Sequence, residues 1–159
     1  MKLNRVIAAV GVIVALPVVA HHSFSIFNHD EVKTFTGVVT RVNPDANHLQ
    51  IFFAPMNAER KNVERDAEGK PLVWAVEMTG SANAAAQGIS VTTFPPGTIF
   101  SVSLNPLRSG EKAGARVGNM FLCPAKKPPA PGKHCDTVEG NVAKGNGPLV
   151  PAADPNNYQ

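Results

Sequence analysis

Two consecutive histidines, His21 and His22, follow an apolar run and carry the most distinctive chemistry in the sequence. If the chain is cleaved after Ala20, His21 gains a free α-amine beside its own imidazole. These two nitrogens can chelate one metal ion, and amine and imidazole nitrogens suit copper(II). One more imidazole completes a three-nitrogen site, and His22 and His48 are the available donors. The pattern therefore predicts a copper site formed by His21, His22 and His48.

The same histidines allow other interpretations. The N-terminal amine, the backbone amide of His22 and the imidazole of His22 can form a chelate that needs no ligand from the folded domain. The stronger motif of this type has histidine at the third mature position, where this sequence has Ser23. Alternatively, the pair is a solvated start of the mature chain, and His48 is a structural histidine on a strand. His29, beside two acidic residues, is interpreted first as part of a polar surface cluster and only second as a metal donor.

The cleavage that creates this chelator is predicted by residues 1–20. Lys2 and Arg5 precede an apolar run that ends in small residues, the pattern of a cleavable signal peptide. At 1.5 Å per residue this run spans only about 22 Å, short of a roughly 30 Å hydrocarbon core, so we expect no permanent membrane span. The mature chain is expected to begin at His21 and to be periplasmic or secreted. An uncleaved N-terminal anchor is the alternative.

Cys123 and Cys135 are the two cysteines of the chain, and in an exported protein such a pair predicts a disulfide. The alternative is a pair of soft metal ligands together with His134. Between the cysteines, Lys126 and Lys127 precede several prolines. This basic loop is interpreted as solvated, with a surface anchor point as the second interpretation.

Charge and motifs exclude several classes of function. Without Lys2 and Arg5 the 15 basic residues become 13, against 12 acidic residues, so the mature chain is nearly neutral. This charge argues against a nucleic acid as the main partner, because phosphate binding needs a dense basic surface. No nucleophile elbow or catalytic triad is evident. Glu77, near Trp74, is expected to face solvent, or else to accept a hydrogen bond from an imidazole or act as an acid or base.

Short apolar and β-branched segments between turn signals predict an all-β fold. The expected strands are 34–42, 48–54, 72–78, 98–104 and a return through 115–117 and 120–122. On the third strand we assign Leu72, Trp74, Val76 and Met78 to the core. Gly37 is expected to mark a bend or bulge.

One short helix is expected between the third and fourth strands, with Ser81 as its N-cap and Gly88 as its C-cap. The polar segment 55–70 is expected to form an exposed excursion. The domain boundaries that follow are a signal peptide at 1–20, a β-barrel domain at 21–123, a disulfide-closed proline-rich loop at 124–137 and a flexible tail at 138–159.

The sequence resembles a bacterial family of small exported proteins of unknown function whose mature chains begin Ala/His-His-Ser-Phe. The resemblance covers most of the chain and rests on these segments: 21–24 (His-His-Ser-Phe), 35–39 with Asn43-Pro44, 74–77 (Trp-Ala-Val-Glu), and 106–110 (Pro-Leu-Arg-Ser-Gly) with Gly114. Members often have a histidine directly after the Asn-Pro pair, where this sequence has Asp45, and His48 follows three residues later. The resemblance implies a five-stranded barrel of the oligonucleotide/oligosaccharide-binding type and supplies no established activity.

The sequence thus predicts an exported β-barrel binding module that holds copper at its N-terminal histidines. The second hypothesis is a metal-free envelope protein that binds an unknown protein or ligand. The third is a copper-dependent oxidase, although enzymatic activity is not favoured.

Overall fold

The computed structural model describes residues 24–45, 47–147 and 149, so His21, His22 and the expected signal peptide lie outside the described residues. Its elements are η1 (Phe24–Ile26), β1 (Lys33–Pro44), β2 (Leu49–Pro55), β3 (Trp74–Glu77), α1 (Ser81–Ala86), β4 (Ile99–Pro106), β5 (Ala113–Leu122), η2 (Cys135–Thr137) and β6 (Val142–Lys144). None of the helices in this part of the chain is long and apolar enough to cross a membrane.

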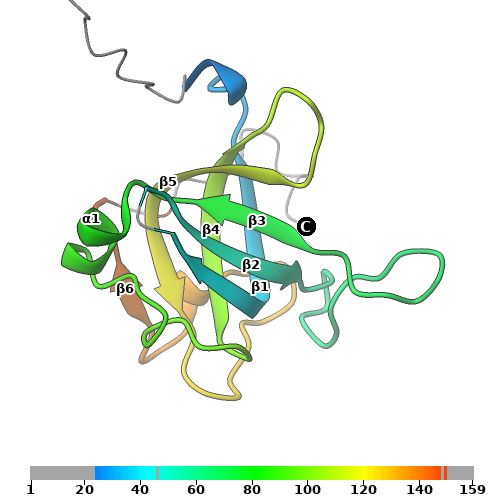
Figure 1. The fold of residues 1–159 in the computed structure, drawn as a ribbon. Helices are drawn as coiled ribbons and strands as arrows, with labels where there is room; N and C mark the ends of the chain where they lie inside the picture. The colour runs from blue at the N-terminus through cyan, green and yellow to red at the C-terminus, as the bar shows by residue number, and fades with distance from the viewer. Residues whose placement is uncertain (1–23, 46, 148, 150–159) are drawn as a thin grey trace, which may run out of the picture.

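The first five strands form a closed barrel, as the sequence predicts. The sheet order is β3-β2-β1-β4-β5-β6, and a parallel pairing of β3 with β5 joins the two sides. The other pairings are antiparallel. The helix α1 follows β3 and lies beside one end of the barrel (Figure 1). The expected five-stranded barrel with one short helix is confirmed.

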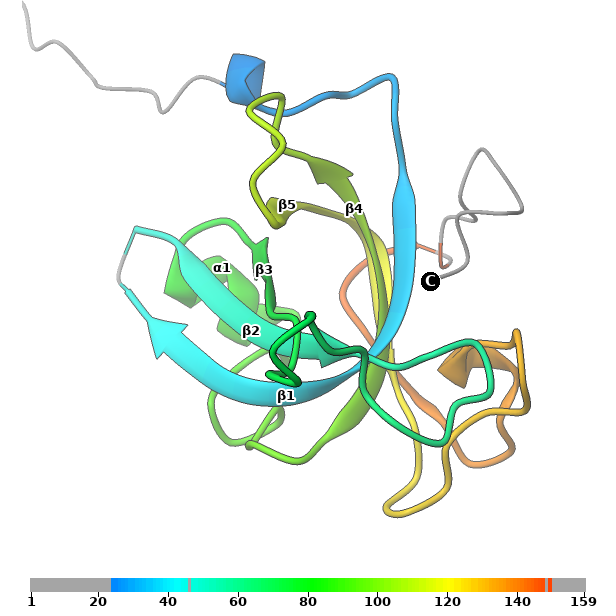
Figure 2. The ribbon, with the colours of Figure 1, turned by 90° about the vertical axis from the view of Figure 1, so that its right-hand side faces the viewer.

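Strand β1 is long and curved, and it pairs with β4 along its first half and with β2 along its second half (Figure 2). Its bulge lies between Val39 and Arg41, not at Gly37. A Cβ on Gly37 would come 2.6 Å from Cδ2 of Phe53 and 2.9 Å from the carbonyl oxygen of Ala54. Glycine is needed there because a ring from the neighbouring strand packs across the backbone.

The barrel interior is filled by aromatic and aliphatic side chains from all five strands. Phe53 meets Phe35 and Phe100 edge to face, with ring centroids 5.7 and 5.4 Å apart. Edge-to-face pairs add specific geometry to the hydrophobic burial. Of the residues assigned to the core on the third strand, Val76 and Met78 are buried and Trp74 packs on the core from its edge.

The helix α1 begins one residue earlier than expected. Its N-cap is Gly80, and the hydroxyl of Ser81 instead donates a hydrogen bond to the carbonyl oxygen of Asp45, so the prediction that Ser81 is the N-cap is wrong. At the other end Gln87 is the C-cap and Gly88 follows it with a φ of +73°. Gly88 ends the helix because a left-handed residue satisfies the last carbonyls.

The polar segment after β2 is less exposed than predicted. Arg60 is only 2% exposed, and it occupies a left-handed conformation with a φ of +57°. Its guanidinium donates from Nε to the carbonyl oxygen of Lys133 at 3.0 Å, and from Nη1 to those of Met56 and Asn57 at 3.1 and 3.2 Å. A buried charge needs hydrogen-bond partners, and here backbone carbonyl oxygens supply them. The segment therefore folds over the Arg60 guanidinium.

The Cys123–Cys135 disulfide is present, which confirms the predicted bond and removes both sulfurs from the alternative metal site. It anchors a second cluster that includes Val138, beside partly buried Ile99 and Phe121. Strand β6 pairs with the end of β5, so ordered structure continues into the segment that the sequence predicts to be a flexible tail. The loop residues Lys126 and Lys127 are exposed.

Removing this disulfide by Cys123→Ser with Cys135→Ser is expected to lower the free energy of unfolding by about 2 to 3 kcal/mol. The reason is that the unfolded chain regains the freedom of a loop spanning 12 positions in sequence. Urea titration of the oxidised protein and the variant measures the loss. Equal midpoints and slopes for the two proteins would contradict this expectation.

Candidate functional site

A pocket of about 430 Å³ opens beside the turn between β1 and β2. Its polar wall comes from that turn and from the strand ends around it, and its apolar wall includes the N-terminal segment. The lining residues are Ile26, Phe27, Asn43, Asp45, Asn47, His48, Gln50, Glu77, Met78, Thr79, Ala115 and Arg116. Segments that are far apart in sequence therefore form one concave surface.

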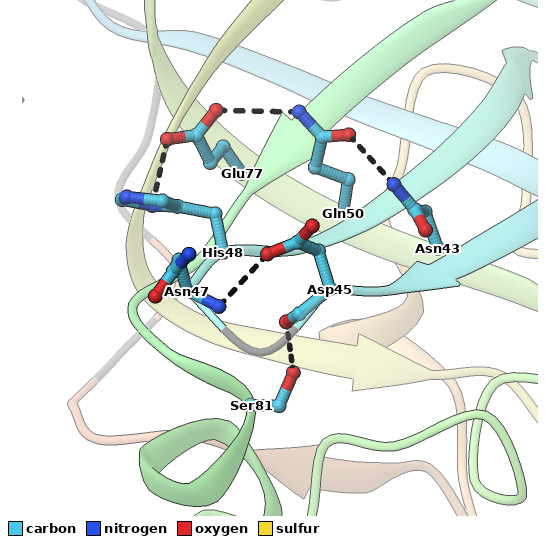
Figure 3. Close-up of polar contacts among 7 residues, drawn as sticks. All are labelled: Asn43, Asp45, Asn47, His48, Gln50, Glu77 and Ser81. Carbon is cyan, nitrogen blue, oxygen red and sulfur yellow. Dashed lines mark hydrogen bonds and ion pairs between the residues drawn. The ribbon is translucent and has the colours of Figure 1, made fainter.

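His48 and Glu77 form a contact inside this pocket. Nδ1 of His48 lies 2.9 Å from Oε1 of Glu77, and the two side chains are 35% and 29% exposed (Figure 3). This contact fixes the orientation of the imidazole ring. Nε2, the second ring nitrogen, therefore points away from the carboxylate. Glu77 is thus the partner of an imidazole, which was the less favoured of the two interpretations of this residue from the sequence.

Two amides extend the His48–Glu77 contact into a row. Oε2 of Glu77 accepts from Nε2 of Gln50 at 3.3 Å, and Oε1 of Gln50 accepts from Nδ2 of Asn43 at 3.5 Å (Figure 3). The strand register brings these three side chains into one row, because Gln50 stands opposite both Glu77 on β3 and Asn43 on β1. Residues directly opposite each other across strands project from the same face of the sheet.

The turn between β1 and β2 is held from two sides. The amide of Asn47 donates to Oδ1 of Asp45 at 2.8 Å, and the carbonyl oxygen of Asp45 accepts from the hydroxyl of Ser81 at the start of α1 (Figure 3). The side chain of Asp45 accepts a local backbone hydrogen bond, as aspartate often does in turns. These contacts fix the start of β2, and with it His48.

Arg116 supplies a positive charge at the other side of the pocket. Its Nη2 donates to Oε1 of Gln87 at 2.5 Å, and its Nη1 donates to the carbonyl oxygen of Gly118. Burial lowers the pKa of the Arg116 guanidinium from its usual value. Arg116 thus ties β5 to the end of α1 and still contributes to the pocket wall.

The predicted metal residues have different outcomes. His48 lies in the pocket, whereas His21 and His22 lie outside the described residues. His29 is exposed and does not line the pocket. Within residues 24–45 and 47–147, no three histidine, cysteine, aspartate or glutamate side chains gather closely enough to hold a metal ion.

The contact between His48 and Glu77 is of a recurrent kind. A carboxylate that contacts one imidazole nitrogen orients the ring, and metal-bound histidines often have such a partner. Gln50, Asn43 and Arg116 were missed as site residues from the sequence. The alternation of β2 places Gln50 on the same face as His48, and that pattern is the signal that could have identified it.

A protein-family model described as "Family of unknown function (DUF6152)" matches residues 10–116. This range contains η1, the barrel strands as far as the middle of β5, and every residue that lines the pocket. No curated protein and no solved structure matches the chain.

Proposed function

Because the chain belongs to this family of unknown function (DUF6152), we propose its function from the pocket alone: an exported β-barrel module that binds one copper(II) ion. The ligands are the α-amine and imidazole of His21, exposed by cleavage after Ala20, and Nε2 of His48. The single observation that carries the proposal is that Ile26 and Phe27 line the same pocket as His48 and Glu77. The described part of the chain thus begins close to a carboxylate-oriented imidazole, which supports the proposal.

The length of the chain permits this site. His21 precedes Ile26 by five residues, and an extended chain reaches about 3.3 to 3.6 Å per residue, so the terminus can extend to roughly 17 Å from Ile26. Three nitrogen donors of this kind suit copper(II) better than the oxygen-preferring ions. The Cys123–Cys135 disulfide is compatible with the oxidising compartment that signal cleavage implies.

Competitive copper titration of protein that begins at His21 tests this function. We expect one tight site, a loss of at least about 100-fold when one glycine precedes His21 or in His21→Ala, and a smaller loss of about tenfold in His48→Ala. His22→Ala separates the two chelates, because a site built from the amide and imidazole of His22 would lose affinity in this variant and not in His48→Ala. Unchanged affinity after blocking the amine would overturn the proposal and favour the metal-free envelope protein.

The carboxylate gives a further prediction. Glu77→Gln is expected to weaken copper binding by about 10- to 100-fold without removing a ligand, because the amide no longer holds Nδ1 of His48 with a negative charge. The same titration measures it. Glu68→Gln, an exposed carboxylate in the segment after β2, serves as the matched control and should bind like the unaltered protein. Equal affinity of Glu77→Gln and Glu68→Gln would show that Glu77 has no role in the site.

A further inference from the structure

A second pocket, of about 360 Å³, lies between the segment before β1, the start of β3 and the turn that joins β4 to β5. One aromatic and five charged side chains line it: Glu31, Lys33, Trp74, Arg108, Glu111 and Lys112. None of the described residues that line this pocket also lines the pocket of His48. A ligand here therefore occupies a different surface from the one discussed above.

Hydrogen bonds to the barrel strands hold the three walls of this second pocket. Strand β3 runs parallel to β5, and the amide of Ala75 donates to the carbonyl oxygen of Lys112 at 2.9 Å. This bond places Trp74, the residue before Ala75, beside the turn. Nδ2 of Asn105 donates to the carbonyl oxygen of Glu31 at 2.7 Å and ties the segment before β1 to β4. The pocket is therefore formed before any ligand binds.

Trp74 gives the pocket an aromatic wall. Its ring packs on Phe35, with centroids 4.7 Å apart and planes at 42°, and the side chain is only partly buried. Within the described part of the chain, Nε1 of Trp74 has no hydrogen-bond acceptor and is not among the buried polar atoms. The indole N–H is thus accessible to solvent. Tryptophan combines an apolar ring with a polar donor, so it suits a ligand that has both kinds of surface.

The charged side chains of this pocket have both signs, two acidic and three basic. Oε1 of Glu31 lies 3.1 Å from Nζ of Lys33, and Oε2 of Glu111 accepts from the hydroxyl of Ser109 at 3.1 Å. An anion is repelled by the carboxylates, and a cation is repelled by the basic groups. A hydroxyl both donates and accepts, so it pairs with either sign. The lining therefore favours a neutral ligand rich in hydroxyls.

We propose that this pocket binds a neutral saccharide, with one sugar ring stacked on Trp74 and its hydroxyls paired with the charged side chains around it. A pyranose ring with equatorial hydroxyls, as in β-linked glucose, has an apolar C–H face and a polar edge, which match the two kinds of wall. The volume lies within the roughly 300 to 1,000 Å³ of small-molecule sites. This function is additional to copper binding and does not depend on it.

Titration with methyl β-cellobioside, a neutral β-linked disaccharide, tests the proposal on protein that begins at His21. Trp74 is the single tryptophan of the chain, so its fluorescence reports directly on this pocket. We expect a saturable change in emission with the disaccharide and none with sorbitol, which has hydroxyls but no ring. In saturation-transfer NMR the axial ring protons should receive the strongest transfer. An unchanged emission, or an equal response to sorbitol, would overturn the proposal.

Three variants locate the binding site by calorimetry. Trp74→Phe keeps an aromatic ring against Phe35 but loses the indole donor and part of the stacking surface, so affinity should fall about tenfold. Glu111→Gln changes an exposed side chain and should weaken binding about fivefold, because the amide is a weaker acceptor than a carboxylate. Glu68→Gln, an exposed carboxylate outside the pocket, is the matched control and should bind like the unaltered protein.

The remaining outcomes separate this site from the copper site. His48→Ala should bind the disaccharide like the unaltered protein, because His48 lines the other pocket. A loss in this variant, or equal affinities of Trp74→Phe, Glu111→Gln and Glu68→Gln, would place the sugar elsewhere and overturn the proposal. A failed copper titration leaves the saccharide site standing, since the two sites share no residue.

Discussion

Replacing Arg60 with alanine is expected to lower the free energy of unfolding by about 4 kcal/mol, the largest effect of any single change considered for this protein. The side chain is 2% exposed, so its removal leaves a cavity. It also leaves three carbonyl oxygens, those of Met56, Asn57 and Lys133, without this donor. Each loss adds to the other, because cavity formation and unsatisfied acceptors are separate costs.

The cost of burying the positive charge of Arg60 partly offsets the stability that this side chain contributes. Burial lowers the pKa of its guanidinium, with an opposing effect of the nearby Glu64 carboxylate, so keeping the charge inside has a cost that alanine removes. Arg60→Met retains most of the volume without the charge or its donors. We therefore expect Arg60→Met to lose about half as much stability as Arg60→Ala.

Urea unfolding followed by circular dichroism measures these differences. Arg65→Ala is the control from the same segment, because Arg65 also donates to a backbone carbonyl but is exposed. Its loss should be below about 1 kcal/mol. If Arg60→Ala is no less stable than Arg65→Ala, the guanidinium does not hold this segment to the disulfide loop.

The second large effect is a loss of stability in acid caused by His134. Its imidazole is 6% exposed and shares a hydrogen bond of 2.8 Å with the hydroxyl of Thr36. Burial and, to a lesser extent, the positive charge of Arg60 lower the pKa of His134 from 6.5 to about 4. The folded protein therefore keeps this ring neutral over a pH range in which the unfolded chain protonates it.

The direction of the effect follows from proton binding. Between pH 6.5 and about 4 the unfolded state binds more protons at this residue, so stability falls as the pH falls through this window. The contribution is complete above pH 6.5 and is lost by pH 4. At about 1.4 kcal/mol for each pKa unit, the total is about 3 kcal/mol.

His134→Gln removes the titrating group while keeping a polar side chain near Thr36. Unfolding free energies measured at pH 7 and pH 4.5 should fall less steeply in this variant than in the unaltered protein, whatever its stability at pH 7. The comparison of slopes isolates the imidazole from other acid-sensitive groups, including Glu64, whose pKa is raised by burial. Parallel pH profiles for the two proteins would contradict a buried neutral His134.

The predicted strand faces were largely confirmed because alternation reports directly which side of a strand is apolar. Leu49, Ile51 and Phe53 were assigned to one face of the second strand, and all three are buried. The same reasoning could not find the buried polar face of β1. Thr36 projects away from the barrel interior, yet it is fully buried and contacts Ser101 and His134.

The candidate site was predictable only in part, for a similar reason. His48 and Glu77 were recognised separately as residues that could carry chemistry, but 29 positions separate them in sequence. Their contact depends on the register between β2 and β3, in which Gln50 stands opposite Glu77. A one-residue change of register would move these side chains to the other face.

The sequence by itself determined the barrel and the disulfide, because alternating apolar residues and a single pair of cysteines leave few ways to bury the chain. The tertiary structure decided which polar residues are covered and which meet in the pocket. Closure through β3 and β5 brings Arg116 near His48, and the turn after β4 brings Arg108 to the N-terminal segment. These contacts depend on how distant strands pack, whereas sequence patterns describe one segment at a time.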